Sequence, residues 1–284
     1  MSLPDTPTTA DGLTLYVREW PHADARGTVL IVHGLGEHIG RYEHVAAHLL
    51  RTGHRVIGYD QRGHGLSQGA RGRLRHTEDL LRDLARVIDA VRERHAGPLL
   101  LLGHSMGGLV AARMVAGGLE PITPEWHREV DALLLSSPAL DAGMSGAQKL
   151  LLSVLGPLAP NLAVGNGLKP DWVSRDPAVV KAYVDDPLVH DRITPRLARF
   201  IVDAGEFVRA HAAQWYLPTL LLYAGSDRCV APGGSAAFAA AVPRGLLTAQ
   251  AFAPLFHEIF NEPEQAEVFA VLAAWLNPPA ARWR

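Results

Sequence analysis

The chain has 284 residues, 48% of them hydrophobic and 20% charged, with 27 lysines and arginines against 29 acids. This composition is too apolar for intrinsic disorder, and a net charge near zero gives no sign of nucleic-acid binding. One cysteine excludes an internal disulfide, and the opening segment MSLPDTPTTADG lacks the basic and apolar parts of a signal peptide. We therefore expect a reduced, cytoplasmic protein, and no apolar run reaches the roughly 18–20 residues that span a bilayer.

Six stretches predict strands. Leu13, Leu15 and Val17 alternate with polar residues, which is typical of a half-exposed strand at a sheet edge. Continuous apolar runs predict parallel strands that are buried on both faces. There are five of these: TVLIVHG from Thr28, RVIGYD from Arg55, PLLLLGH from Pro98, ALLLSSP from Ala132 and TLLLYAG from Thr219.

Helical periodicity separates these runs, most clearly from Glu78 to Arg94, where leucine and valine fall on one face. Alternation of strands and helices predicts an α/β fold with a mostly parallel central sheet flanked by helices. Between residues 141 and 212, helical stretches punctuated by proline replace the strands. We therefore predict a core of residues 1–140 and 213–284 with an inserted helical cap of residues 141–212.

A nucleophile motif follows the third apolar run. Gly103-His104-Ser105-Met106-Gly107 lies between a predicted strand and a helical run, the setting that G-x-S-x-G needs to lift a serine hydroxyl above the sheet. The glycines allow a turn too sharp for side chains. Ser105 is thus the candidate nucleophile of a serine hydrolase.

A serine hydroxyl needs a base, and the base needs an orienting acid. Asp227, after the strand that ends near Ala224, and His257, after the last apolar stretch, give the order Ser, Asp, His that this fold requires. Asp141 is the alternative acid, and Glu258 is a poor one because it adjoins the histidine. We therefore predict the triad Ser105, Asp227 and His257.

The other histidines near these motifs are assigned structural roles. His104 should pack beneath the nucleophile turn, and His64, in Arg62-Gly63-His64-Gly65, should shape a loop. The chain has fourteen histidines, and we predict His257 as the base because it follows the last apolar stretch, where this fold places its histidine.

The loop His33-Gly34-Leu35-Gly36-Glu37 follows the first buried strand, where an oxyanion-hole amide is expected. We predict the Leu35 amide, together with that of Met106 at the start of a helix. The same glycines, with Asp60 ending the next strand, resemble a dinucleotide-binding turn. In that alternative the spacing of the glycines differs by one residue from the G-x-G-x-x-G pattern, and the triad residues would have no role.

Several motifs together resemble the monoacylglycerol lipase and lysophospholipase branch of the α/β-hydrolases over nearly the whole chain: HGLGEHIGRY from His33, YDQRGHGLSQGARG from Tyr59, GHSMGG from Gly103, DPLVHDRIT from Asp186, GSDRCV from Gly225 and FHEIFNE from Phe256. The resemblance implies a serine hydrolase that needs no metal or organic cofactor and acts on esters of one fatty acyl chain. It places the nucleophile, acid and base on Ser105, Asp227 and His257, and the oxyanion amides on Leu35 and Met106.

The resemblance also implies that Glu37 and Arg41 lie near the alcohol end of the site, although a fold-stabilising ion pair explains these two residues equally well. The apolar stretch from Leu150 to Leu158 predicts either packing of a cap helix or an acyl tunnel or lipid-facing surface that includes Leu151 and Leu155. Monoacylglycerol lipase is the predicted activity. Lysophospholipase and general carboxylesterase are the alternatives, an acyltransferase and a non-catalytic binding protein the more remote ones, and the oligomeric state is left open.

Overall fold

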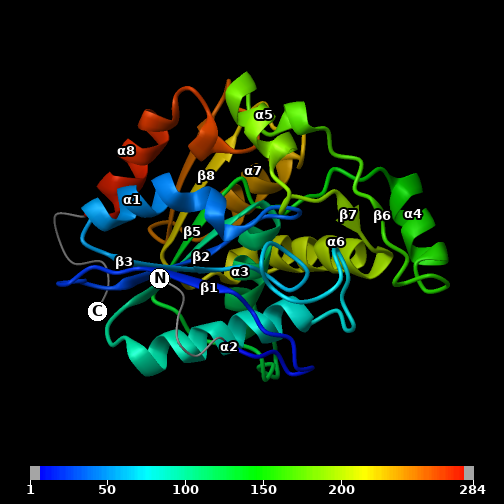
Figure 1. The fold of residues 1–284 in the computed structure, drawn as a ribbon, viewed down its shortest axis with the longest axis horizontal. Coiled ribbons are helices and arrows are strands. Elements are labelled where there is room, and N and C mark those ends of the chain that lie inside the picture. Colours follow the sequence, from blue (N-terminus) through cyan, green and yellow to red (C-terminus); the bar gives the residue numbers. More distant parts are fainter. Residues whose placement is uncertain (1–6, 278–284) are drawn as a thin grey trace.

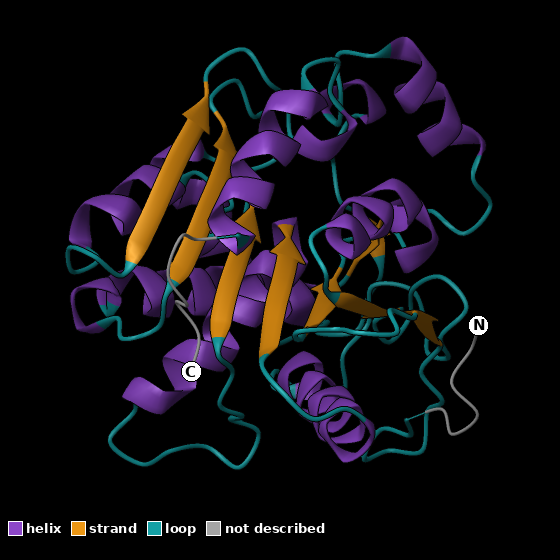
Figure 2. Ribbon diagram, turned by 90° about the vertical axis from the view of Figure 1, so that its left-hand side faces the viewer, coloured by secondary structure: helices purple, strands orange, loops and turns teal. Residues whose placement is uncertain are grey.

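The computed structural model describes residues 7–277, and a seven-stranded sheet forms its centre. The spatial order is β1-β3-β2-β4-β5-β8-β9, and all neighbouring strands run parallel except β1, which is antiparallel to β3. Figure 2 shows the parallel arrows side by side, with helices packed against them. The strands are β1 (Val17–Trp20), β2 (Thr28–Val32), β3 (Arg55–Tyr59), β4 (Leu99–His104), β5 (Ala132–Ser136), β8 (Thr219–Ala224) and β9 (Leu247–Phe252).

Helices cover both faces of the sheet because each central strand is apolar on both sides (Figure 1). Alternate residues of one strand enter different clusters: Leu99 and Leu101 pack with α2, α3, α6 and α7, whereas Leu100 and Leu102 pack with α1 and α8. The predicted doubly covered, mostly parallel α/β fold is confirmed. The helices are α1 (Glu43–Arg51), α2 (Asp79–Arg94), α3 (Ser105–Ala116), α6 (Pro195–Ala210), α7 (Pro232–Ala241) and α8 (Gln265–Leu276).

The first strand begins later than its alternating pattern predicts. Leu15 and Val17 are fully buried, but the backbone of the preceding stretch bonds to a loop instead of a strand. The amide of Thr14 donates to the Gln68 side chain and that of Tyr16 to Ser67. Pairing with β3 starts only at Val17, so the alternation reports burial rather than strand pairing here.

Between β5 and β8 the chain leaves the sheet. This excursion contains α4 (Gly146–Leu155), β6 (Val164–Gly165), the short helix η3 (Pro170–Trp172), α5 (Pro177–Asp185), β7 (Arg192–Ile193) and α6. Figure 1 shows α5 at the top of the molecule and α4 at its far right, away from the sheet. The division at residues 141 and 212 stays a prediction, and the last of these helices, α6, contributes Leu197, Phe200 and Val208 to the main core cluster.

The excursion meets the core at the edge where the parallel strands end. The amide of His190 donates to the Gly36 carbonyl at 2.8 Å, and Asp186 pairs with His38 at the same distance. Gly36 has a φ of +80°, and a side chain there would come within 2.2 Å of the His190 carbonyl oxygen. The loop after β2 therefore lies tightly under the excursion.

Candidate active site

The turn between β4 and α3 holds Ser105 in a strained conformation. Its φ is +54°, a left-handed value that costs a non-glycine residue of the order of 1–3 kcal/mol. Glycines on either side make the turn possible, because a side chain at Gly103 would meet the Gly107 carbonyl oxygen at 2.6 Å and one at Gly107 would meet that of Val32 at 2.1 Å. The predicted strand-turn-helix setting of Ser105 is present.

The structure brings together the three residues of the predicted triad. His257 Nε2 lies 2.8 Å from Ser105 Oγ, and His257 Nδ1 lies 2.7 Å from Asp227 Oδ2. The other oxygen of Asp227 accepts the backbone amides of Cys229 (2.8 Å) and Val230 (3.1 Å). These bonds fix the carboxylate, which in turn orients the imidazole so that Nε2 faces the serine hydroxyl.

The charges of the triad follow from its burial. Burial raises the pKa of the Asp227 carboxyl, but the neighbouring His257 and the amides that it accepts lower it below its usual range. Burial lowers the pKa of His257, whereas the Asp227 carboxylate raises it, and the net direction is upward. An ionised aspartate therefore stabilises the imidazolium that forms when the serine loses its proton.

The other candidates have different hydrogen-bond partners. Asp141 accepts the amide of Gly143 at 2.9 Å. The His104 ring is buried beneath the turn, contacts Ser136 and lies 4.8 Å from the His257 ring, and burial lowers its pKa to about 4. His64 bonds to the carbonyl of Arg62 within its own loop.

A dinucleotide site would need Asp60 to bind a ribose, but this side chain is 1% exposed and accepts hydrogen bonds from backbone amides. One oxygen of its carboxylate accepts the amide of Ile39 and the other accepts the amide of Leu66. Both oxygens are therefore engaged within the fold, and the dinucleotide alternative has no acid to offer.

The predicted oxyanion amides lie on the two turns that flank the nucleophile. Met106 is in the first turn of α3, where backbone amides have no partner within the helix. Leu35 lines the cavity beside Ser105 and follows Gly34, whose missing side chain would otherwise approach the Ser105 Cβ at 3.1 Å. The loop after β2 is thus close enough to the serine for a second donor.

Glu37 and Arg41 form a buried ion pair, one of the two interpretations that the sequence left open. Arg41 Nη1 donates to Glu37 Oε2 at 2.7 Å, and the same guanidinium binds both oxygens of Glu258. Glu258 is 6% exposed. Sequence reasoning dismissed Glu258 as an acid and gave it no other role, since its partner lies 217 positions away in the chain.

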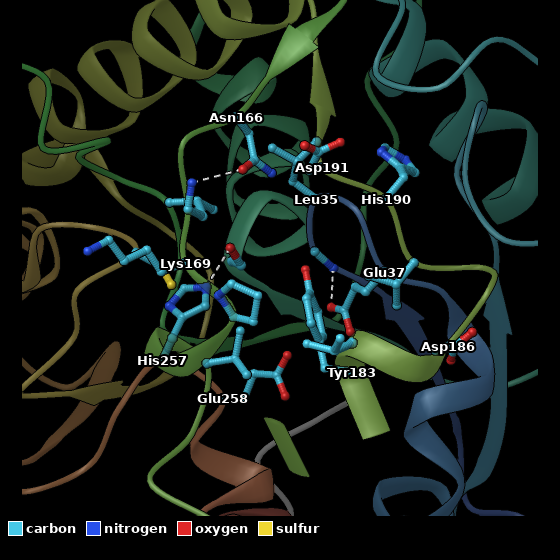
Figure 3. Close-up of a pocket in the computed structure, with 18 of the residues that line it drawn as sticks. Leu35, Glu37, Asn166, Lys169, Tyr183, Asp186, His190, Asp191, His257 and Glu258 are labelled. Atoms are coloured by element: carbon cyan, nitrogen blue, oxygen red, sulfur yellow. Dashed lines mark hydrogen bonds between the residues drawn. The ribbon is translucent and has the colours of Figure 1, made fainter. Parts of the chain in front are cut away.

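A cavity of about 320 Å³ opens above Ser105 (Figure 3). Its floor comes from the core, and much of its wall comes from the excursion between β5 and β8. Figure 3 shows Lys169 and His257 on one side, with Glu37 and Tyr183 opposite them. Wall residues that the sequence did not predict as part of the site are Asn166, Leu168, Lys169, Pro170, Val173, Tyr183, Val184, Asp186, Val189, His190 and Asp191, the last four of which lie in the motif DPLVHDRIT.

The structure does not bring Leu151 to this cavity. Leu151 is 58% exposed on the outer side of α4, and the cavity wall is formed by later residues of the excursion instead. The side chain of Leu155 lies outside the described residues. A role of Leu151 in an acyl tunnel stays a prediction, and Figure 1 shows α4 away from the sheet.

One group of residues in the described chain has the composition of a metal site. Donor atoms of Asp227, Cys229 and His257 lie within 4.8 Å of one another. His257 and Asp227 already share a hydrogen bond of 2.7 Å, which a metal bound between them would break. That the reaction needs no metal or organic cofactor stays a prediction.

Residues 23–264 match the family described as serine aminopeptidase, S33. The chain is 36% identical over 270 residues to a monoacylglycerol lipase of Mycolicibacterium smegmatis, covering 93% of each chain, and 30% identical to the phospholipase YtpA of Bacillus subtilis, covering 88% of this chain and 94% of that one. The crystal structure of Paleococcus ferrophilus monoacylglycerol lipase superposes with a TM-score of 0.81 at 34% identity, covering 92% of this chain and 98% of the other. The chain therefore belongs to the S33 family of α/β-hydrolases, in its monoacylglycerol lipase and lysophospholipase-like branch, and is a serine hydrolase.

Proposed function

We propose that the protein is a carboxylic-ester hydrolase that cleaves monoacylglycerols to a fatty acid and glycerol through an acyl-enzyme on Ser105. The observation that carries this proposal is the hydrogen-bonded chain from Ser105 through His257 to Asp227, which opens into a cavity lined by both apolar and polar side chains. The names of the Mycolicibacterium and Paleococcus relatives support the choice of substrate.

In the proposed mechanism the hydroxyl of Ser105 attacks the ester carbonyl while His257 Nε2 accepts its proton. The amides of Leu35 and Met106 donate to the oxyanion of the tetrahedral intermediate. His257 then returns the proton to the departing alcohol, which leaves the acyl group on Ser105. A water molecule, deprotonated by the same base, attacks the acyl-enzyme and releases the fatty acid.

A second candidate is the hydrolysis of lysophospholipids, since the Bacillus relative is named a phospholipase. Lys169 contributes a cation to the cavity wall, which suits the phosphate of such a substrate. A general carboxylesterase would be indifferent to either head group. In both the monoacylglycerol and the lysophospholipid proposals, the substrate is a small lipid ester.

The exposed side of α4 suits contact with a lipid surface from which such a substrate is drawn. Leu150, Leu151 and Val154 in α4, and Leu158 in the turn after it, are each more than half exposed. In the described chain no helix is both long and apolar enough to cross a bilayer, so the contact that we propose is peripheral. The cytoplasmic location stays a prediction.

The test compares monoacylglycerols, lysophospholipids and short nitrophenyl esters side by side, with and without an added alcohol. We expect the highest kcat/KM for a monoacylglycerol, free fatty acid as the product, and a loss of about 10⁴ to 10⁶ in turnover in Ser105→Ala with an unchanged circular dichroism spectrum. Transfer of the acyl group to the alcohol in preference to water would indicate an acyltransferase. Inactivity of the wild type on every ester would leave a binding protein.

A further inference from the structure

Two buried acids meet at one arginine beside the triad. Arg41 Nη1 donates to Glu37 Oε2 at 2.7 Å and to Glu258 Oε1 at 2.6 Å, and Arg41 Nη2 donates to Glu258 Oε2 at 2.7 Å. The exposed fractions of the three side chains are 12%, 5% and 7% for Arg41, Glu37 and Glu258. Ions this buried are stable only when they are fully partnered, so these three side chains are held in one arrangement.

The first end of this bridge holds the turn that carries the predicted oxyanion donor. Glu37 Oε1 accepts the backbone amide of Gly34 at 2.6 Å and the hydroxyl of Tyr42 at 2.7 Å. Gly34 directly precedes Leu35. The position of the Leu35 amide therefore depends on where the Glu37 carboxylate is fixed.

The second end holds the loop that carries the base. Glu258 directly follows His257, and its carboxylate also accepts the side-chain amide of Asn261 at 2.8 Å. Its backbone amide donates to the Val173 carbonyl at 2.8 Å. The residue next to the base is thus tied through both its side chain and its backbone.

The bridge is closed from above by the excursion. The guanidinium carbon of Arg41 lies 4.8 Å from the centre of the Tyr183 ring, which belongs to α5. Burial raises the pKa of Glu37, but Arg41 opposes this and the net pKa falls to about 2; the pKa of Glu258 is lowered in the same way. Both acids are therefore ionised at neutral pH, and both remain bound to the arginine.

We propose that Arg41 is a positioning residue, and that the Glu37–Arg41–Glu258 bridge holds the oxyanion turn and the His257 loop at the separation that the transition state requires. The inference rests on the proposed ester hydrolysis. A transition state needs the base on one side of the reacting carbon and the donors on the other, and a shift of about 1 Å between such groups lowers the rate about 100-fold. No other contact described above joins these two loops through a single side chain.

The test is a double-mutant cycle with Glu37→Gln and Glu258→Gln, measured on a water-soluble nitrophenyl ester. Each single variant should lower kcat about 10- to 100-fold with KM within threefold, and should weaken inhibition by an alkyl boronic acid, which forms a tetrahedral adduct on the serine, by a similar factor. The double variant should lose little more than the worse single variant, because both changes break the same bridge.

The matched control is Asp83→Asn, which breaks another buried ion pair, Arg62 Nε to Asp83 at 2.5 Å, between α2 and the loop after β3. It should lower the melting temperature and leave kcat unchanged. Arg41→Lys is the second variant, because an ammonium keeps the charge but cannot bind both carboxylates in this geometry. It should fold and still lose kcat, even if a glutamine variant fails to fold.

Three results would overturn the inference in an active wild-type enzyme: additive losses in the double variant, a rise in KM with kcat intact, or an equal loss of kcat in Asp83→Asn at the same fall in melting temperature. The second of these would make Glu37 and Arg41 binding groups for the alcohol. A wild type that hydrolyses no ester would overturn the proposed function itself, and the inference with it.

Discussion

Asp227 is distinguished from the alternative acid by what its two oxygens do. One binds His257 and the other accepts two backbone amides, whereas Asp141 accepts an amide of its own loop. Asp227→Asn should therefore lower turnover about 10⁴-fold, since an amide at this position favours the wrong tautomer of the histidine.

Asp141→Asn is the control for that change and should stay within about threefold of the wild type in a soluble-ester assay. Both variants should keep the circular dichroism spectrum of the wild type. If the two losses came out reversed, the acid would belong to the loop after β5.

His257 also sets the pH dependence. It must be uncharged to accept the proton of Ser105, and Asp227 raises its pKa above the ordinary value of about 6.5. The fraction of active base therefore falls as the pH drops, and kcat/KM should decline with a midpoint above pH ~6.5. Initial rates from pH ~9 down to ~4.5, with the fold checked at each point, measure this, and a rate that stays flat down to pH ~4.5 would remove histidine as the base.

At the scale of helices and strands, continuous apolar runs were enough to locate β2, β3, β4, β5 and β8, because strands buried on both faces leave no place for polar residues. The edge strand β9 escaped assignment as a strand. Its middle residues are exposed, so Leu247–Phe252 shows neither a continuous run nor a clear alternation. In the sequence this segment was recognised only as the last apolar stretch before His257.

The motifs likewise selected Ser105, Asp227 and His257, which the structure brings within hydrogen-bonding distance, because a turn forced by two glycines is a local feature. The partners of Glu258 are not local: Arg41 lies at the opposite end of the sequence and Tyr183 lies in the excursion. Several wall residues of the cavity, among them Asn166, Lys169 and Asp191, lie in loops outside any strand or helix, where the sequence shows no periodicity. Three-dimensional packing alone brings these residues to the site.

Helix α4 gives a prediction of its own. The exposed leucines of α4 and of the turn after it would lose contact with a lipid surface on replacement by aspartate, so Leu151→Asp with Leu158→Asp should lower the hydrolysis of monoacylglycerol in vesicles about tenfold or more. Hydrolysis of a water-soluble ester should not change. Comparing the two substrates separates docking from chemistry.

A matched control for α4 is Ile122→Asp, which alters a side chain that is 85% exposed in the loop before β5. This variant should behave as the wild type on both substrates. Equal losses on vesicles and on the soluble ester in the α4 variant would show that α4 supports the fold or the cavity and not a lipid contact.

For the molecule as a whole, several buried histidines should control the response to acid. Burial lowers the pKa of His54, His104 and His190 to about 4, and lowers that of His33 and His64 as well. The unfolded chain takes up protons on these rings below pH ~6.5 while the native chain does not, so the free energy of unfolding is greatest above pH ~6.5 and is lost as the pH falls towards 4. The pKa of His257 is raised, so this ring has the opposite effect on the free energy of unfolding, but it is one ring against several.

Urea unfolding at pH ~7.5, 6 and 5 measures this effect, and each such ring contributes up to about 1.4 kcal/mol per pH unit within its range. His54→Gln should make the loss shallower without touching the active site, since His54 packs beside Thr52 at the far end of α1. A urea midpoint that is the same at pH ~7.5 and ~5 would contradict the assignment of these rings as neutral.

The contact between Gly36 and His190 limits how this part of the sequence can change in evolution. The groups proposed for the chemistry follow β2, β4, β8 and β9, whereas the cavity wall comes from the segment between α4 and β7. A descendant can therefore exchange that segment while it keeps the register of the sheet and the core residues of α6. The new segment has to supply a backbone amide that donates to the Gly36 carbonyl, as His190 does now. Position 36 has to remain glycine as long as a backbone carbonyl of that segment lies within 2.2 Å of the place of a Cβ. Selection for a new substrate would then leave this glycine unchanged while the residues around it diverge.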